Sequence, residues 1–263
     1  IPWDENDIIS TEGRAKVVRC FDEYLHYGGL PASAMMPAKR DYLSSVYQKI
    51  YMGDIIARNN ITNVAGIRIL VRKMAESVCR PISYNRVNNL LSSVGGKLSL
   101  ATTIKYVEYC ENAWLLMRVR NYATSLADKE SNCKYYFIDT GILGLFLIDK
   151  GTMLLENLVA LQLFRIYGHD MDNERVFFYK TGYEVDFYVP EDELAIQVSY
   201  SLLDDETRKR ETEALSKLPG HLSCRRRLIL TYDDENSITD KHGTIEVLPT
   251  WKWLLDSRHI KKG

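Results

Sequence analysis

The stretch from residue 176 to 199 constrains the fold most, because it predicts consecutive β-strands. It starts with a β-branched and aromatic run, and Thr181-Gly182 then marks a turn. From 184 to 189 polar and apolar side chains alternate, which places the apolar ones on a single face. Pro190 and three acidic residues form a second turn, after which residues 194–198 return as an apolar strand. The stretch therefore predicts part of a sheet with one face packed on a core.

Two acidic side chains lie on the polar face of this predicted strand. Glu184 and Asp186 are two positions apart, so roughly 7 Å separates them along the strand. Gln197 faces them from the next strand. Two carboxylates beside a polar partner can hold a divalent metal ion. Spacing alone also fits a solvated strand face whose acids bind nothing, and it favours this simpler interpretation.

Length and composition set wider bounds. With 263 residues, of which 46% are hydrophobic, the chain is long enough for two domains with cores. Its 34 Lys and Arg against 35 Asp and Glu give a net charge of −1, which neither predicts nor excludes a nucleic-acid partner. The 5 cysteines include no Cys-x-x-Cys pair, which is typical of free thiols in a reducing cytoplasm. No run is long enough to span a bilayer and no signal-peptide pattern occurs, so we expect a cytoplasmic protein without a membrane partner.

Residues 1–60 are predicted to form a helical linker. Because the first residue is Ile1 rather than Met, we expect a fragment of a longer protein or a processed chain. A short helix is expected at 17–25 and a longer one from about 38 to 58, with a turn between them. On the longer helix, the buried stripe would consist of Tyr42, Val46, Ile50 and Ile55.

Residues 61–130 predict a winged helix-turn-helix domain. Three short helices are expected at 64–78, at 83–93 and from 99 onward, with Ser83 and Ser99 as N-caps. A β-ribbon follows the third helix, which completes the winged pattern. The segment 80–110 is locally basic, because it contains four cations and a single acid.

The third helix of this domain would turn a polar face outward near its N-terminus. Hydroxyls, a lysine and an aromatic ring on that face suit contacts to phosphates and base edges. The candidate nucleic-acid-binding residues are Arg86, Lys97, Thr102, Thr103, Lys105 and Tyr106. The alternative is a winged helix that mediates protein packing only, because four spread cations are a small footprint for DNA.

From residue 131 to 263 the pattern changes to α/β. Strands are expected at 135–139, 176–199, 225–232 and 245–248, with a strongly apolar helix at 153–167 and a charged helix at 204–218. The predicted fold class is therefore α+β and α/β, with a winged helix-turn-helix followed by a mixed sheet flanked by helices.

Several segments together resemble a known family. They are Tyr27-Gly28-Gly29-Leu30-Pro31, residues 43–58, Tyr106-Val107-Glu108-Tyr109, Phe137-Ile138-Asp139-Thr140-Gly141, Leu155-Glu156-Asn157-Leu158 and residues 179–186. From about Phe21 onward the chain resembles the C-terminal region of a widespread bacterial and archaeal family of predicted AAA-type ATPases. In that family a P-loop domain precedes a winged helix and a domain with the restriction-endonuclease-like PD-(D/E)xK fold. Since no P-loop motif occurs here, the resemblance implies an ATPase without its ATP-binding domain.

The resemblance also implies a nuclease-like site. In nucleases of this fold a helix supplies Glu, one strand supplies Asp, and the next strand supplies Glu-x-Lys. Glu156 resembles the helix acid and Asp186 the strand acid, which makes these two the candidate ligands for Mg²⁺. Gln197 and Ser199 stand where the pattern has Glu and Lys. A neutral amide is a poor ligand for a divalent cation, and the missing lysine would steady developing negative charge, so we expect a degenerate site. Glu184 is the candidate replacement ligand because it shares the face of Asp186.

Three functions remain open from the sequence. The first is a regulatory module of a AAA-type ATPase that binds nucleic acid or a partner protein and has no enzymatic activity or cofactor of its own, since ATP would bind only the missing N-terminal domain. The second is a Mg²⁺-dependent DNase that uses Glu156, Asp186 and Glu184. The third is a structural domain that drives oligomerisation. The expected partners are accordingly DNA, the protein's own ATPase domain or a second copy. The Gln197/Ser199 pair disfavours the enzyme and the local basic bias favours nucleic acid, so we expect the first function.

Overall fold

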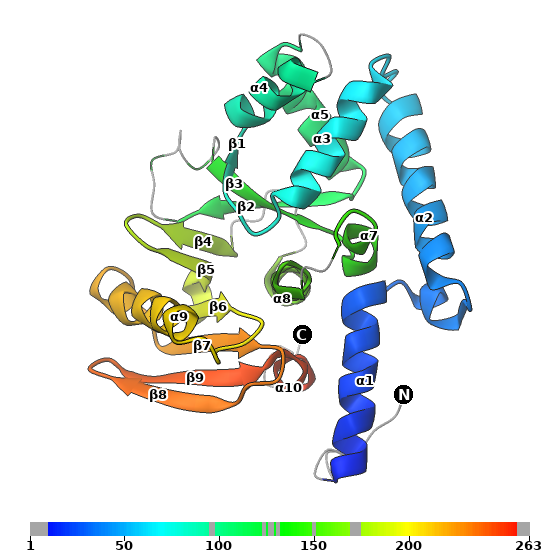
Figure 1. Cartoon of the computed structure of the whole chain (residues 1–263). Helices are drawn as coiled ribbons and strands as arrows, with labels where there is room; N and C mark the ends of the chain where they lie inside the picture. The colour runs from blue at the N-terminus through cyan, green and yellow to red at the C-terminus, as the bar shows by residue number, and fades with distance from the viewer. Residues whose placement is uncertain are drawn as a thin grey trace.

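The computed structural model describes residues 10–94, 98–122, 125, 129, 132–148, 151–168 and 175–256. Over these residues the chain combines helices with a mixed nine-stranded sheet (Figure 1). The strand order is β1-β3-β2-β4-β5-β6-β7-β9-β8. Among the described helices, none has both the length and the apolar character that crossing a membrane requires.

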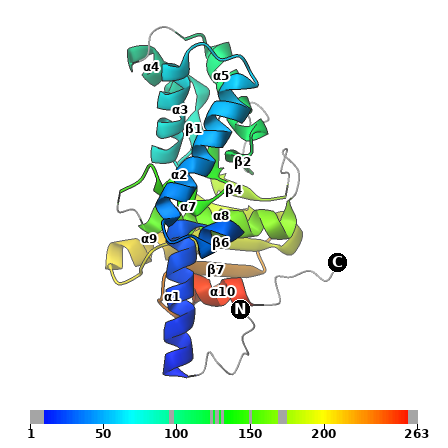
Figure 2. The same cartoon turned by 90° about the vertical axis from the view of Figure 1, so that its right-hand side faces the viewer.

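The N-terminal helices lie along one side of the molecule (Figures 1 and 2). Helix α1 (Thr11–Tyr27) is capped by the Ser10 hydroxyl, which accepts from Gly13 N at 2.9 Å. A short 3-10 helix, η2 (Pro31–Met35), leads to α2 (Lys39–Lys49), and α2 continues into the π-helix η3 (Ile50–Ala57). The helix predicted at 38–58 is therefore present, with a change of winding in its second half.

The buried stripe of α2 and η3 differs from the prediction. It consists of Leu43, Tyr47, Tyr51 and Ile55. Of the expected stripe only Ile55 is fully buried. The observed residues are four apart, and such a stripe drifts around an α-helix of 3.6 residues per turn. The wider π-helical turns from Ile50 onward compensate for this drift, which the α-helical template could not predict.

The next segment runs through three helices and three strands. In chain order it comprises α3 (Val64–Glu76), β1 (Ile82–Ser83), α4 (Tyr84–Val94), α5 (Leu100–Asn112), β2 (Leu116–Asn121) and β3 (Asn132–Phe137). The predicted N-caps are confirmed, since Ser83 Oγ accepts from Arg86 N at 3.3 Å and Ser99 Oγ from Thr102 N at 3.1 Å. Strand β3 pairs antiparallel with both β1 and β2. Strands β1 and β2 lie before residue 131 and β3 lies after it. The domain boundary expected at residue 131 therefore separates β3 from the two strands with which it pairs.

The remaining strands extend the same sheet. Strand β2 pairs in parallel with β4 (Phe177–Lys180), which joins the two parts of the sheet. Strands β5 (Glu184–Val189) and β6 (Leu194–Val198) follow as antiparallel neighbours, as the alternation predicted. Beyond them lie β7 (Arg226–Thr231), β9 (Gly243–Pro249) and the edge strand β8 (Asn236–Asp240).

Helices cover both faces of this part of the sheet. On one face Ile196 packs in the core cluster that contains α8 (Gly151–Tyr167) and α10 (Thr250–Leu255). On the other face the neighbouring Ala195 packs with Leu215 of α9 (Asp205–Lys217). All five residues of β6 are buried, as expected for a strand covered on both sides. A short helix, α7 (Thr140–Gly144), leads from β3 toward α8.

Candidate nuclease-like site

A buried lysine joins three carboxylates between β3, β5 and α8. The Nζ atom of Lys134 lies 3.2 Å from Oε1 of Glu156, 2.9 Å from Oε1 of Glu184 and 3.0 Å from Oδ1 of Asp186. The lysine side chain is 0% exposed, whereas 27% of the Glu184 side chain is exposed. Tyr136 OH donates to the same Glu156 oxygen at 2.7 Å. The three acids predicted for the nuclease-like site therefore converge on one ammonium group.

Three elements, β3, β5 and α8, position these side chains. Lys134 and Tyr136 are two residues apart on β3, so they emerge from the same face of the strand. Glu184 and Asp186 share a face of β5 for the same reason, as the alternation predicted. Glu156 belongs to the first half of α8, whose buried apolar side chains fix that helix against the sheet.

Gln197 forms a bridge beside this cluster. Its Oε1 accepts from the backbone N of Asp186 at 2.7 Å, and its Nε2 donates to the Glu184 carbonyl at 3.2 Å and to Glu211 Oε2 at 2.6 Å. The amide is thus engaged by the backbone of β5 and by a carboxylate of α9. Ser199 Oγ donates to the Ser201 carbonyl at 3.0 Å. These contacts explain why a neutral amide at position 197 suits the fold.

The charges of the cluster shift the pKa values of its members. Burial alone would lower the pKa of Lys134, but the carboxylates of Asp186, Glu156 and Glu184 outweigh burial and raise it well above the ordinary value. Burial, with repulsion from Asp186, raises the pKa of Glu156 to about 7. Burial opposes ionisation of Glu184 too, yet Lys134 and Lys180 hold its pKa below the ordinary value. Lys134 is therefore the permanent cation of the cluster.

The three carboxylates of the cluster surround an ammonium group. The three oxygens lie 2.9–3.2 Å from Nζ, which are hydrogen-bond lengths, whereas Mg²⁺ binds oxygen at about 2.0–2.1 Å. The ammonium also occupies the point toward which all three carboxylates turn. Within the described residues, no group of three or more His, Cys, Asp or Glu side chains is arranged to hold a metal ion. The sequence predicted a metal ion at Glu156 and Asp186. At that position the structure has the ammonium group of Lys134.

Sequence reasoning missed the central residue of this site. Lys134 lies one residue before the strand predicted at 135–139, so the predicted strand did not include it. The available signal was a lysine in a strand whose next three residues are aromatic and buried, namely Tyr135, Tyr136 and Phe137. Glu211 was also missed, because α9 has a strongly charged sequence in which this single buried acid does not stand out.

The candidate nucleic-acid-binding residues are only partly exposed. Arg86 and Lys105 are exposed, and Thr102 is half-buried, with its hydroxyl 2.8 Å from Ser99 Oγ. Lys97 lies outside the described residues. Two expectations about the outward face of α5 are wrong. Thr103 is 0% exposed and donates to Asn88 Oδ1, and Tyr106 is 7% exposed, because both face the packing side of α5.

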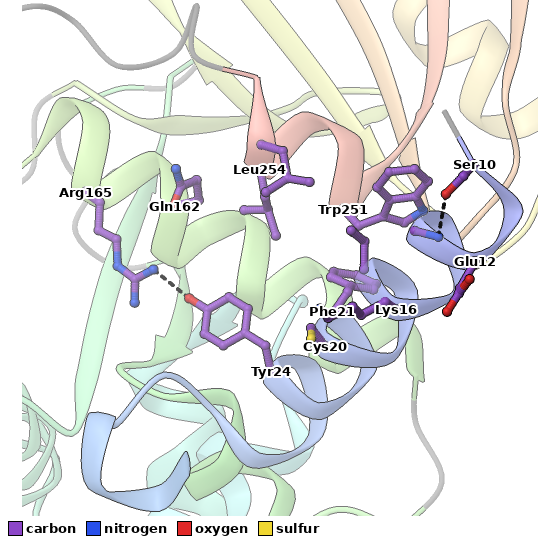
Figure 3. A pocket seen from close by; sticks show the side chains of 13 residues that line it. Ser10, Glu12, Lys16, Cys20, Phe21, Tyr24, Gln162, Arg165, Trp251 and Leu254 are labelled. Carbon is purple, nitrogen blue, oxygen red and sulfur yellow. Dashed lines mark hydrogen bonds between the residues drawn. The ribbon is translucent and has the colours of Figure 1, made fainter. Parts of the chain in front are cut away.

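Two hollows lie away from this site. A groove of about 670 Å³ runs between α1, α8 and α10, and its floor includes Phe21, Trp251 and Leu254 (Figure 3). At one end Arg165 Nη1 donates to Tyr24 OH at 2.6 Å. A smaller cavity of about 280 Å³ lies beside the end of α5 and shares Arg165 with the groove. Neither hollow includes any of the predicted site residues.

Comparison with known proteins places the chain among uncharacterised relatives. It is 31% identical over 260 residues to the uncharacterized protein MJ1544 of Methanocaldococcus jannaschii, a match that covers 94% of this chain and 58% of that protein. It is 26% identical over 247 residues to an uncharacterized protein of Haemophilus influenzae, with 91% and 58% covered. The chain thus spans 58% of the length of each of these relatives. No solved structure matches it.

A family match covers the first half of the molecule. Residues 18–151 match the domain of unknown function DUF8612, a range that includes α2 to β3 and therefore Lys134. The carboxylates of α8 and β5 lie beyond the matched range. Because the match covers residues 18–151 of 263, just over half of the sequence, the chain belongs to the family defined by domain DUF8612.

Proposed function

We propose that this chain is a binding and regulatory module of a larger AAA-type ATPase, and that its nuclease-like site holds the fold together rather than cutting DNA. The observation that carries this proposal is the position of Lys134. A buried ammonium that pairs with Glu156, Glu184 and Asp186 occupies the position at which a hydrolytic metal would act.

The order of elements from α3 to β3 supports the binding part of the proposal. Three helices, with a short strand after the first and two longer strands at the end, follow one another in the order that a winged helix-turn-helix would have. The short strand β1 pairs with β3, which also pairs with β2. Arg86 on α4 and Lys105 on α5 are exposed cations of this unit and are suited to phosphate contacts.

The length of the relatives supports the modular part of the proposal. The chain spans only 58% of each, so both contain substantial sequence outside the matched region. Together with the resemblance to the C-terminal region of predicted ATPases, this favours a module that acts together with a further domain.

Duplex binding tests the proposal. We expect the chain to bind a short fluorescent DNA duplex, with an affinity that falls as salt rises. Arg86→Ala combined with Lys105→Ala should reduce the slope of log affinity against log salt by about 2, roughly one for each phosphate contact. Lys209→Ala removes an exposed cation of α9 and serves as the matched control. Equal binding by the double variant and the wild type would remove this surface from the account.

A Mg²⁺-dependent DNase is the second candidate, because three carboxylates do meet at one point and Glu184 is partly exposed. Its test is the nicking of supercoiled plasmid in Mg²⁺ or Mn²⁺. Nicking that Asp186→Ala abolishes would favour this enzyme over the binding module, and nicking that survives the substitution would come from a contaminant.

A further inference from the structure

The backbone turn that ends α5 contains an unusual residue. Leu115 N donates to the Cys110 carbonyl at 2.9 Å and Trp114 N to the Glu111 carbonyl at 2.9 Å. These two bonds form a Schellman turn, in which the residue with left-handed backbone is usually glycine. Here that residue is Trp114, with φ +54. A large side chain in this conformation is uncommon and strained.

Packing does not account for the tryptophan either. Trp114 is 52% exposed, whereas Trp251 and Trp253 are 2% and 1% exposed. Glycine would suit the turn better. An indole held at a strained, exposed position suggests a role outside the fold, because such strain persists at sites that bind or react.

Trp114 is one of the residues that line the cavity of about 280 Å³ beside α5. Apolar side chains, among them Leu116, Leu161 and Phe164, line this cavity. Its charged groups differ in their partners. Arg118 pairs with Glu111 at 3.2 Å, so these two charges offset each other.

The second cation of the cavity is held by a neutral partner. Arg165 Nη1 donates to Tyr24 OH at 2.6 Å, and its guanidinium lies 6.0 Å from the centre of the Tyr24 ring (Figure 3). Arg165 also interacts electrostatically with the carboxylate of Asp139, but it is exposed, so its charge can also reach an anion in solution. The cavity thus combines an exposed aromatic side chain and apolar lining residues with Arg165, which it shares with the neighbouring groove.

We propose that Trp114 and Arg165 form a binding site for a nucleobase and its attached phosphate. The base stacks on the indole at the mouth of the cavity, and the guanidinium of Arg165 pairs with the phosphate. Aromatic stacking beside a cation is the recurring way in which proteins hold unpaired nucleotides. The inference extends the nucleic-acid role proposed above to a second surface, distinct from the exposed cations of α4 and α5.

Two sources can supply this ligand, namely a free nucleotide or an unpaired nucleotide of a single strand. Fluorescence anisotropy of 5′-fluorescein-labelled (dT)12 and calorimetric titration with dTMP distinguish them. Binding of dTMP with an affinity close to that of the oligonucleotide indicates a free nucleotide. Binding of (dT)12 alone indicates a single strand.

The decisive variant is Trp114→Gly, which relieves the strained backbone while it removes the platform. We expect it to bind at least roughly tenfold more weakly, as stacking of one base requires. Its melting temperature should stay within about 2 °C of the wild type. Trp114→Phe should retain most of the binding. Arg165→Gln should weaken binding and reduce the salt slope by about 0.7, the value for one phosphate of a single strand.

Control variants keep the proposal open to refutation. Trp114→Leu preserves apolar bulk without an aromatic ring and should bind as poorly as Trp114→Gly, whereas Leu203→Ala, at an exposed residue elsewhere, should bind like the wild type. Wild-type affinity in Trp114→Gly or Trp114→Leu would overturn the proposal, and so would a wild type that binds neither (dT)12 nor dTMP. If duplex binding is lost only in the Arg86 and Lys105 variant, that result bears on the function proposed above and leaves the Trp114 site unaffected.

Discussion

The Nζ atom of Lys134 lies 3.0 Å from Oδ1 of Asp186, although 52 residues separate the two in the chain. The second oxygen of the same carboxylate accepts from Val198 N at 3.0 Å. Asp186 therefore links the lysine of β3 to the backbone of β6 across the intervening strands. The carboxylate that the family resemblance made a candidate metal ligand serves here as an internal connection.

Removal of the lysine charge should destabilise the protein strongly. Lys134→Met keeps much of the side-chain volume but leaves three carboxylates with no buried cation between them. Loss of one partner of a buried ion pair costs roughly 3–5 kcal/mol. We expect a decrease of this size in the free energy of unfolding, measured by urea denaturation. Lys209→Met, at an exposed position of α9, is the matched control and should change it by less than about 0.5 kcal/mol. A small effect of Lys134→Met would mean that the acids do not depend on the lysine.

Glu156 should make stability depend on pH near neutrality. Its pKa in the folded protein is raised to about 7 by burial and by Asp186, above the ordinary value of 4.5. The stability that its neutral form contributes is fully present below pH 4.5 and is lost as the pH rises through about 7. The size of the loss, on the order of 3 kcal/mol, follows from the shift in pKa. Glu156→Gln cannot ionise, so it should gain stability relative to the wild type between pH 5 and pH 8. Parallel stability profiles of the two proteins over that range would contradict this assignment.

The contact between Gly28 and Asp139 should not tolerate a side chain. Gly28 has φ +76 and ψ −174, a conformation that is essentially restricted to glycine. A Cβ atom there would lie 2.0 Å from Oδ1 of Asp139, whose carboxylate accepts from Gly29 N at 2.8 Å and caps α7 through Ile142 N at 3.0 Å. We expect Gly28→Ala to lower the free energy of unfolding by about 2 kcal/mol or more. Gly53→Ala is the matched control, since nothing lies within 4 Å of a Cβ at that helical position. Equal melting curves for the two variants would exclude the contact as a structural constraint.

The ion pair of Arg227 and Asp240 should protect the edge of the sheet against acid. Two hydrogen bonds of 2.6 and 2.8 Å join them, and the Arg227 side chain is only 2% exposed. The hydrogen bond from this guanidinium is the main reason that the pKa of Asp240 is held well below its ordinary value. The stability that Asp240 contributes is therefore present above about pH 4 and is lost as the pH falls through the lowered folded-state pKa. Asp240→Asn should destabilise the protein at pH 7 by about 3 kcal/mol, because the buried guanidinium loses its counter-charge. The free energy of unfolding of this variant should also change less as the pH falls below about 4. Chemical denaturation at pH 7 and pH 3 measures both effects.

Some of this architecture follows from sequence pattern alone. The alternation from Glu184 to Val189 predicts both the strand and the shared face of its two acids, because each acidic residue is separated from the next by an apolar one. Ser83 and Ser99 as N-caps follow from local chemistry in the same way. The meeting of Glu156 with Asp186 was expected only from the resemblance, since no local rule brings a helix residue to a strand thirty positions later.

What the sequence does not reveal depends on tertiary contacts. A lysine before a strand usually lies in solvent, and Lys134 is buried only because three acids from distant elements surround it. Strand β8 has a polar sequence and is a strand because its backbone pairs with β9 at the sheet edge. Thr103 and Tyr106 were predicted to be exposed, but they lie on the buried face of α5. The prediction was wrong because a helix of mixed composition offers two plausible polar faces.

Titration of Mn²⁺ into the purified chain, followed by calorimetry at pH 7, tests most directly whether Lys134 serves as the cation of the site. The account predicts no binding at the cluster of Glu156, Glu184 and Asp186, and therefore identical traces for the wild type and Asp186→Ala. Saturable binding of one Mn²⁺ that Asp186→Ala removes would contradict it.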